Sequence, residues 1–149
     1  MGASQRYHAV VDVHLFLIHD GQILLGERQN TGYEDGKYHV PAGHLEAGET
    51  LVDALVREAH EEIGIQIDPA DVQFAHLMHH RSNEGRIAAF FAVSSWSGEV
   101  QNTELDKCAK LEWFDLELLP ENVIPYARYA IGQYVAGVPF SLYGWAPAP

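Results

Sequence analysis

The chain has 149 residues, of which 47% are hydrophobic, and a formal net charge of −12 at pH 7. This length predicts one domain, large enough to bury roughly two-thirds of the surface of the unfolded chain. The acidic balance, without a basic stripe, argues against a protein that binds a nucleic-acid duplex through its phosphates. Cys108 is the only cysteine, so an intrachain disulfide is excluded and a reducing compartment is compatible with the chain.

The ends of the chain carry no recognisable targeting pattern. The N-terminal segment MGASQRYH lacks a basic region followed by an apolar core, so no signal peptide is expected. No apolar run approaches the roughly 20 residues of a membrane span. We therefore expect a cytoplasmic protein without a membrane partner. Residues 1–149 show no internal repeat or linker, and residues 144–149 are expected to form a loose tail.

Three strands are predicted in the first part of the chain. Residues 8–18 are apolar and rich in β-branched side chains, and a turn at residues 19–21 leads to a returning strand over residues 22–26. Residues 29–37 are predicted to form a polar loop that contains glycine. A short strand over residues 38–41 is expected to end where Pro41, Ala42 and Gly43 interrupt it.

A helix is predicted between Thr50 and Gly64. Thr50 is a suitable N-cap, and Asp53 three residues later gives a weak form of the capping box. Gly64 is suited to the residue that ends the helix, where a positive φ favours glycine. Apolar side chains recur at steps of three and four, which predicts a buried face. This face is formed by Leu51, Ala54, Leu55, Ala59 and Ile63.

The second half of the chain is predicted to return to strands and to end with a helix. Strands are expected over residues 65–67, 72–79, 86–94 and 111–114, with a loop over residues 81–85. Helical spacing recurs over residues 124–135. Trp113 and Phe114 are typical of core residues, although aromatic rings can also stack on a base. Cys108 is more typical of a packed small hydrophobe than of a nucleophile.

The polar face of the first helix carries three carboxylates close together. Residues three and four apart share a helix face, so Glu58 lies beside both Glu61 and Glu62. Like charges at this spacing destabilise a helix by a few tenths of a kcal/mol per pair. A divalent cation would offset the repulsion, and all-oxygen ligands suit Mg²⁺ or Mn²⁺. The alternative is a solvated acidic face on which Arg57 merely pairs with Glu61.

The spacing of residues 43–65 distinguishes these interpretations. The run GHLEAGETLVDALVREAHEEIGI fits the pattern G-x5-E-x7-R-E-U-x-E-E-x-G-U, in which U is a bulky apolar residue. Ala59 is smaller than the pattern usually has. The joint match favours a catalytic motif, and the run resembles the box of the Nudix hydrolases. The matching residues are Gly43, Glu49, Arg57, Glu58, Glu61, Glu62 and Gly64.

The resemblance implies an α/β (α+β) fold, in which a mixed β-sheet is sandwiched between helices and the box forms a loop–helix–loop. It implies a Mg²⁺-dependent enzyme, with Mn²⁺ as a substitute, that cleaves a nucleoside diphosphate linked to another group. Glu61 would also orient or deprotonate water, Arg57 would hold a carboxylate in place, and Glu49 would tie the loop to the helix. The implied metal ligands are Glu58, Glu61, Glu62 and the carbonyl of Gly43.

Residues outside the helix are further candidates. The resemblance suggests Glu104 as a general base or an additional metal ligand, and the alternative is an acid on a surface loop. Arg81 and His44 are candidates for contact with substrate phosphate, although His44 can equally be a loop residue. Tyr33 is either a base-stacking residue or a turn residue.

The substrate is less closely defined. The loop 28–38 and the tract 104–114 resemble the bacterial MutT-like branch, which suggests a nucleoside triphosphate, in ordinary or oxidised form, cleaved to monophosphate and pyrophosphate. ADP-ribose or another nucleoside diphosphate derivative is the alternative. A binding module and an isopentenyl diphosphate isomerase remain other options, but the box is intact and Cys108 is in the wrong region for the isomerase. Many relatives are homodimers, and no sequence feature identifies an interface.

Overall fold

The computed structural model describes residues 5–146, apart from the side chains of residues 83 and 84. In this part of the chain an eight-stranded mixed sheet has the order β3-β2-β1-β6-β5-β8, with β4 paired to β1 and β7 paired to β2. The pairs β1–β6 and β5–β8 are parallel, and the other pairs are antiparallel. The strands are β1 (Val11–His19), β2 (Gln22–Arg28), β3 (Tyr38–His39), β4 (Ala42–His44), β5 (Gln73–His80), β6 (Arg86–Val93), β7 (Cys108–Asp115) and β8 (Phe140–Tyr143).

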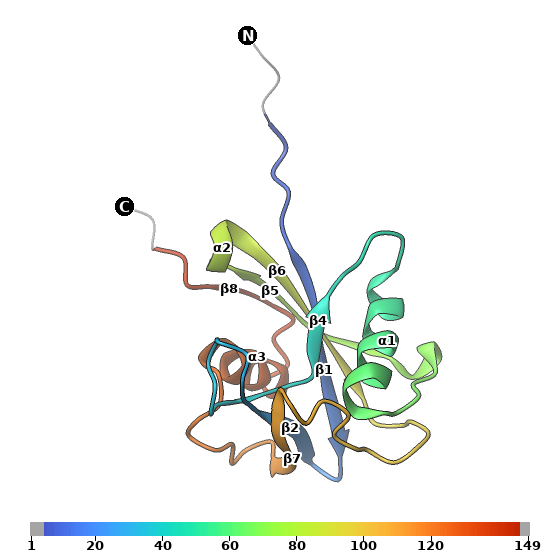
Figure 1. Cartoon of the computed structure of the whole chain (residues 1–149). Coiled ribbons are helices and arrows are strands. Elements are labelled where there is room, and N and C mark those ends of the chain that lie inside the picture. The colour runs from blue at the N-terminus through green and yellow to red at the C-terminus, as the bar shows by residue number, and fades with distance from the viewer. Residues whose placement is uncertain (1–4, 147–149) are drawn as a thin grey trace.

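Two helices pack on the sheet from different sides, α1 (Leu51–Ile63) and α3 (Pro125–Val135) (Figure 1). Successive residues of a strand point to opposite faces, and β1 follows this rule. Leu15 and Leu17 belong to the core against α1, whereas Phe16 belongs to the core against α3. The mixed sheet between helices confirms the predicted fold class. No helix in residues 5–146 combines the length and the apolar character needed to cross a membrane.

Helix α1 has the predicted caps and the predicted buried face, except that Leu51 is only partly buried. The Thr50 hydroxyl accepts a hydrogen bond from the Asp53 backbone N–H at 3.0 Å, and the Asp53 carboxylate accepts one from the Thr50 N–H at 3.1 Å. Gly64 ends the helix with φ of 71°. The side chains that bury this helix against the sheet are Ala54, Leu55, Ala59 and Ile63.

Strand β4 corrects the prediction that the chain leaves the sheet at Pro41. The Pro41 carbonyl accepts a hydrogen bond from the Leu15 N–H at 2.8 Å, and the chain then pairs with β1 through Val13 and Gly43. Proline lacks an N–H but retains its acceptor, so it does not prevent pairing of the next residue. Pairing with β1 fixes the start of the motif beside α1.

Further predictions about elements differ from the structure. Residues 65–67 make only a single bridge, between Gln66 and Ser97, because the rest of the segment connects α1 to the short 3₁₀ helix Pro69–Asp71. The expected loop at 81–85 contains the one-turn helix α2 (Ser82–Gly85), and β7 begins three residues before residue 111. Strand β8 was not predicted.

The expected loose tail is anchored at one described residue. The Trp145 indole N–H donates to the His79 carbonyl at 2.8 Å. Residues 147–149 lie outside the described part of the chain.

Candidate active site

Gly43 and Glu58 bring strand β4 and helix α1 into close contact. A Cβ atom on Gly43 would lie 2.1 Å from Oε1 of Glu58, which is closer than two non-bonded atoms can approach. Only glycine therefore lets this carboxylate lie against the strand. The sequence pattern that pairs a glycine with a glutamate fifteen residues later thus has a steric cause.

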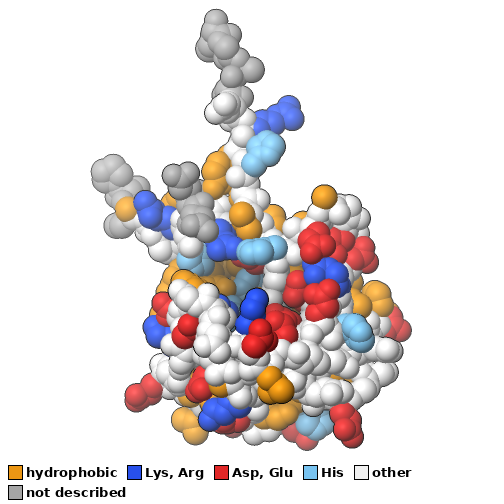
Figure 2. Space-filling model, viewed as in Figure 1, with side chains coloured by type: hydrophobic (Ala, Val, Ile, Leu, Met, Phe, Trp, Pro, Cys, Tyr) orange, Lys and Arg blue, Asp and Glu red, His pale blue; other side chains and the backbone are white. Residues whose placement is uncertain are grey.

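Arg57 holds the acidic side chains around it at fixed positions. Its guanidinium donates two hydrogen bonds to Glu49, from Nε at 3.0 Å and from NH2 at 2.7 Å. NH1 donates to Glu58 Oε1 at 2.8 Å and lies 3.3 Å from Glu61 Oε2. The His44 carbonyl accepts a further bond from NH2 at 3.2 Å. Figure 2 shows these acidic side chains gathered around a basic one over α1.

Glu62 points toward the strand rather than into solvent. Its Oε2 accepts a hydrogen bond from the Ala42 backbone N–H at 3.0 Å. Burial, together with the charges of Glu58 and Glu104, raises its pKa to about 9. Burial also raises the pKa of Glu58, and the charges of Glu61 and Glu104 act in the same direction against the opposing effect of Arg57. These carboxylates repel one another, and burial penalises the charged forms of Glu58 and Glu62.

A cavity of about 540 Å³ lies beside these carboxylates. Its acidic lining comprises Glu58, Glu62, Glu104 and Glu27, and Gly43 contributes to the same wall. The structure therefore brings Glu104 from the β6–β7 connection to the same cavity as the helix carboxylates. Arg28 and Lys107 line the same cavity and provide positive charge.

The carboxylates fit a hard divalent cation by their chemistry. Glu58 and Glu62 each have one oxygen held by the protein, by Arg57 and by the Ala42 N–H respectively, and a second oxygen available to a cation. Mg²⁺ takes one or two protein carboxylates and completes its shell with water and phosphate oxygens. Among the described residues, no group of three His, Cys, Asp or Glu side chains is placed to hold a metal ion.

The other predicted residues differ in their distance from the cavity. Glu61 is 54% exposed and is not part of the wall, although its charge acts on Glu58 and Glu62. His44 lies on the wall, with its Nδ1 in contact with the Asp12 carboxylate. Tyr33 lines a second, smaller cavity, where the Arg28 guanidinium lies 5.5 Å from its ring centre.

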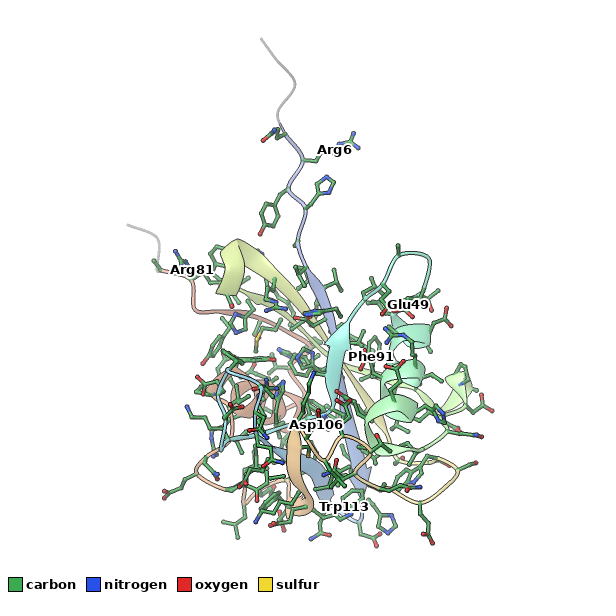
Figure 3. The ribbon with its side chains drawn as sticks, in the orientation of Figure 1. Arg6, Glu49, Arg81, Phe91, Asp106 and Trp113 are labelled. Atoms are coloured by element: carbon green, nitrogen blue, oxygen red, sulfur yellow. The ribbon has the colours of Figure 1, made fainter. Side chains whose placement is uncertain are left out.

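Arg81 is not brought to either cavity. It is exposed, its backbone N–H donates to the Tyr143 carbonyl, and its side chain lies against Gly144. Figure 3 shows Arg81 near the C-terminal trace, away from Glu49 beside α1. The structure therefore gives no support to a role for Arg81 in substrate binding.

The sequence analysis missed the cations that face the carboxylates. Arg28 ends strand β2, where its Nε donates to the Tyr33 carbonyl at 2.9 Å and NH2 donates to Thr31 Oγ1 at 3.0 Å. Lys107 follows Glu104 by three residues, and its backbone N–H donates a hydrogen bond to the Glu104 carbonyl. Neither residue belongs to a periodic pattern of apolar side chains. The only signals in the sequence were the position of Arg28 beside a polar loop and the position of Lys107 close to the candidate acid Glu104.

Comparison with known proteins agrees with this geometry. The sequence model of the NUDIX domain matches residues 6–133. An NAD-capped RNA hydrolase NudC from Vibrio parahaemolyticus is 35% identical over 122 residues, which are 80% of this chain and 44% of that protein. An ADP-ribose pyrophosphatase from Methanocaldococcus jannaschii is 30% identical over 122 residues, 81% of this chain and 70% of that protein. The chain thus spans less than half of the Vibrio relative.

Solved structures show the same arrangement of strands and helices. The crystal structure of a MutT NUDIX hydrolase from Burkholderia pseudomallei superposes with a TM-score of 0.76 and 28% identity, covering 85% of this chain and 98% of that one. The solution structure of the E. coli ORF135 protein gives a TM-score of 0.70 at 26% identity, covering 86% and 89% of the two chains.

Proposed function

The chain belongs to the Nudix family, and from this premise we propose that it hydrolyses the diphosphate linkage of a nucleoside diphosphate joined to a second group. The observation that carries the proposal is the meeting of Glu58, Glu62 and Glu104 at one cavity wall beside Gly43. Three carboxylates from two distant segments suit a site for a cation, and Arg28 and Lys107 of the same cavity suit a phosphate.

We propose Mg²⁺, with Mn²⁺ as a substitute, as the cation of this site. Glu58 and Glu62 would hold it, with the Gly43 carbonyl and, from the rim, Glu61. When bound, the cation neutralises phosphate charge and lowers the pKa of a coordinated water. Phosphoryl transfer depends chiefly on positioning and charge neutralisation, so the remaining contribution of the protein is to orient the reactants.

Other residues of the cavity have separate proposed roles. Arg57 fixes the orientation of Glu58 and Glu49 and does not itself line the cavity. Arg28 and Lys107 lie where they can contact phosphate oxygens. Glu104 is the proposed general base, because it lines the cavity beside the helix carboxylates and a carboxylate there can accept the proton of the attacking water.

Two substrate classes are proposed for this site. The likeness of residues 28–38 and 104–114 to the MutT-like branch favours a nucleoside triphosphate, ordinary or oxidised, cleaved to monophosphate and pyrophosphate. The relative named as an ADP-ribose pyrophosphatase, which this chain covers over 70% of its length, favours a nucleoside diphosphate sugar as the second candidate.

Release of phosphate, pyrophosphate and nucleoside monophosphate across a substrate panel tests the proposal. The panel contains ordinary and oxidised nucleoside triphosphates, ADP-ribose, NADH, diadenosine polyphosphates and nucleotide sugars, each with Mg²⁺ and with a chelator. Turnover that requires Mg²⁺ is expected for one class. Nucleotide binding without turnover of any compound would instead indicate a binding module.

A further inference from the structure

A second cavity of about 270 Å³ adjoins the cavity that holds the carboxylates. The two share the part of their walls where Gly43 and Arg28 lie, so a ligand bound at the carboxylates can extend from one into the other. The residues that line both are Arg28, His39, Ala42, Gly43 and His44.

The walls of the second cavity carry no excess of acidic charge. Its only carboxylate among the described residues, Asp12, is paired with Arg86 at 3.0 Å between Oδ2 and Nε, and it also contacts His44. The remaining walls are formed largely by histidine and tyrosine side chains. This chemistry suits an uncharged polar group better than it suits a cation.

A buried chain of three polar side chains forms one wall of this cavity. The Tyr126 hydroxyl lies 2.9 Å from His14 Nε2 and 3.0 Å from His39 Nε2. Burial lowers the pKa of His14 to about 4 and the pKa of His39 well below its usual value, so both imidazoles are neutral near pH 7. The hydroxyl has one proton, so two hydrogen bonds require that Tyr126 donates to one histidine and accepts from the other.

Two opposite directions satisfy this chain. Nδ1 of His14, like Nδ1 of His39, is buried without a hydrogen-bond partner among the described residues. If Tyr126 donates to His14 Nε2, His39 donates its Nε2 proton to the Tyr126 oxygen and His39 Nδ1 is an acceptor; in the opposite direction His39 Nδ1 carries the proton. In either direction the second ring nitrogen of His39 needs a partner.

His39 Nδ1 has no partner in the described part of the protein. His39 is only 8% exposed, and its Nδ1 atom is buried without a hydrogen bond. A buried polar atom without a partner is costly, because it has lost its contact with water. The atom belongs to a residue that lines the boundary between the two cavities.

We propose that the second cavity receives the group attached to the diphosphate, and that His39 Nδ1 forms a hydrogen bond with a hydroxyl of that group. His39 is then a specificity-determining residue, while Tyr126 and His14 are positioning residues that hold its ring through the hydrogen-bonded chain. The expected ligand is a nucleoside diphosphate whose second group is an uncharged, hydroxyl-bearing sugar. The inference rests on the proposed function, since it takes the diphosphate to lie at the carboxylates.

A pair of probes that differ in the second group tests this role. ADP-ribose carries hydroxyls there, and the butyl ester of ADP carries none. Dissociation constants are measured by calorimetry with Ca²⁺ in place of Mg²⁺ to suppress turnover, and hydrolysis of both probes is measured separately with Mg²⁺. The wild-type protein is expected to bind ADP-ribose at least about tenfold more tightly than the ester.

Variants of the hydrogen-bonded residues identify which side chain causes any preference for ADP-ribose over the ester. His39→Phe is expected to lose the preference, and His39→Asn, whose side-chain amide can replace the lost hydrogen bond, is expected to retain part of it. Tyr126→Phe preserves the shape and removes the hydroxyl, so we expect weaker binding of ADP-ribose and a smaller preference over the ester. Tyr134→Phe is the matched control, because Tyr134 lies on the same helix and packs against the same core but lines neither cavity.

The outcomes separate this inference from the proposed function. Equal binding of the two probes by the wild-type protein, failure to bind ADP-ribose, or an unchanged preference in His39→Phe would overturn the inference and indicate that water alone occupies the cavity. Hydrolysis of either probe in those cases would leave the proposed function standing. Preferential binding that depends on His39, without hydrolysis of any substrate, would support the inference and contradict the enzyme.

Discussion

At the scale of single residues, the geometry of the acidic cluster depends on Arg57. One planar guanidinium contacts the loop through Glu49 and the helix through Glu58, and its NH2 also reaches the His44 carbonyl. Arginine can make such contacts because its donors form a rigid fork, whereas a lysine ammonium acts as a point charge. The Arg57 side chain is one-quarter exposed, so its ion pairs contribute more to orienting the carboxylates than to stabilising the fold.

Arg57→Lys is therefore expected to lower turnover by about 10- to 100-fold, as is common when a residue that orients metal ligands is replaced. The charge is retained, but two parallel hydrogen bonds to Glu49 are lost. The measurement is kcat against Mg²⁺ concentration, in which the variant should also need more Mg²⁺. Wild-type rates at ordinary Mg²⁺ would show that Arg57 contributes only surface charge.

At the scale of elements, the site depends on the close approach of β4 and α1. Gly43→Ala would place a Cβ on the Glu58 carboxylate, so that either the side chain or the strand must move. We expect a loss of Mg²⁺ affinity and of activity, detected by calorimetry and by rate. Gly132→Ala is the matched control, since its added Cβ meets nothing within 4 Å on α3 and should raise the melting temperature slightly. Equal Mg²⁺ affinity in Gly43→Ala and wild type would contradict this role of the glycine.

Helix α1 could be predicted from sequence because all its signals are local. Its caps at Thr50 and Gly64, its apolar stripe and its carboxylates lie within one continuous run. Strand β8 could not be predicted because its four residues carry no periodicity, and it exists through parallel pairing with β5. The same limit applies to β4, whose pairing partner β1 lies some thirty residues earlier.

The candidate site, like the fold, was predictable where its signals are local in sequence and not where they depend on distant contacts. Its acidic part was predicted where the carboxylates are spaced on one helix, as Glu58 and Glu62 are, whereas Glu27 on β2 was not predicted. Arg28, His39 and Tyr126 come from β2, β3 and α3 and meet only in the folded protein. No spacing rule connects them, so the sequence gives no warning that they share a cavity wall.

At the scale of the whole molecule, the buried carboxylates couple stability to pH and to metal. Without a cation, Glu62 has a folded pKa of about 9, above its ordinary value of 4.5. The folded protein therefore binds more protons than the unfolded chain between these values, and stability falls as pH rises through this window. The measurement is the melting temperature from pH 5 to pH 9 in a chelator, where a decline toward pH 9 is expected.

Mg²⁺ should counter this decline, because it binds the ionised carboxylates of the folded protein. Its effect on the melting temperature is expected to be larger at pH 8 than at pH 5, where protons compete. Glu62→Gln, which cannot ionise, should show a flatter pH profile and a smaller response to Mg²⁺. An identical pH profile in wild type and variant would contradict the burial of an ionisable group at this position.

The central claim is that the carboxylates facing the cavity make this protein a metal-dependent hydrolase. The most direct test is the Mg²⁺-dependent rate of diphosphate cleavage by Glu62→Gln, measured on the substrate that the wild type cleaves best. Glu99→Gln, at an exposed loop position outside both cavities, is the control. The account predicts that Glu62→Gln loses at least about 100-fold in rate while folding normally, as expected when charge stabilisation at the reacting phosphate is removed. A rate equal to that of Glu99→Gln would contradict it.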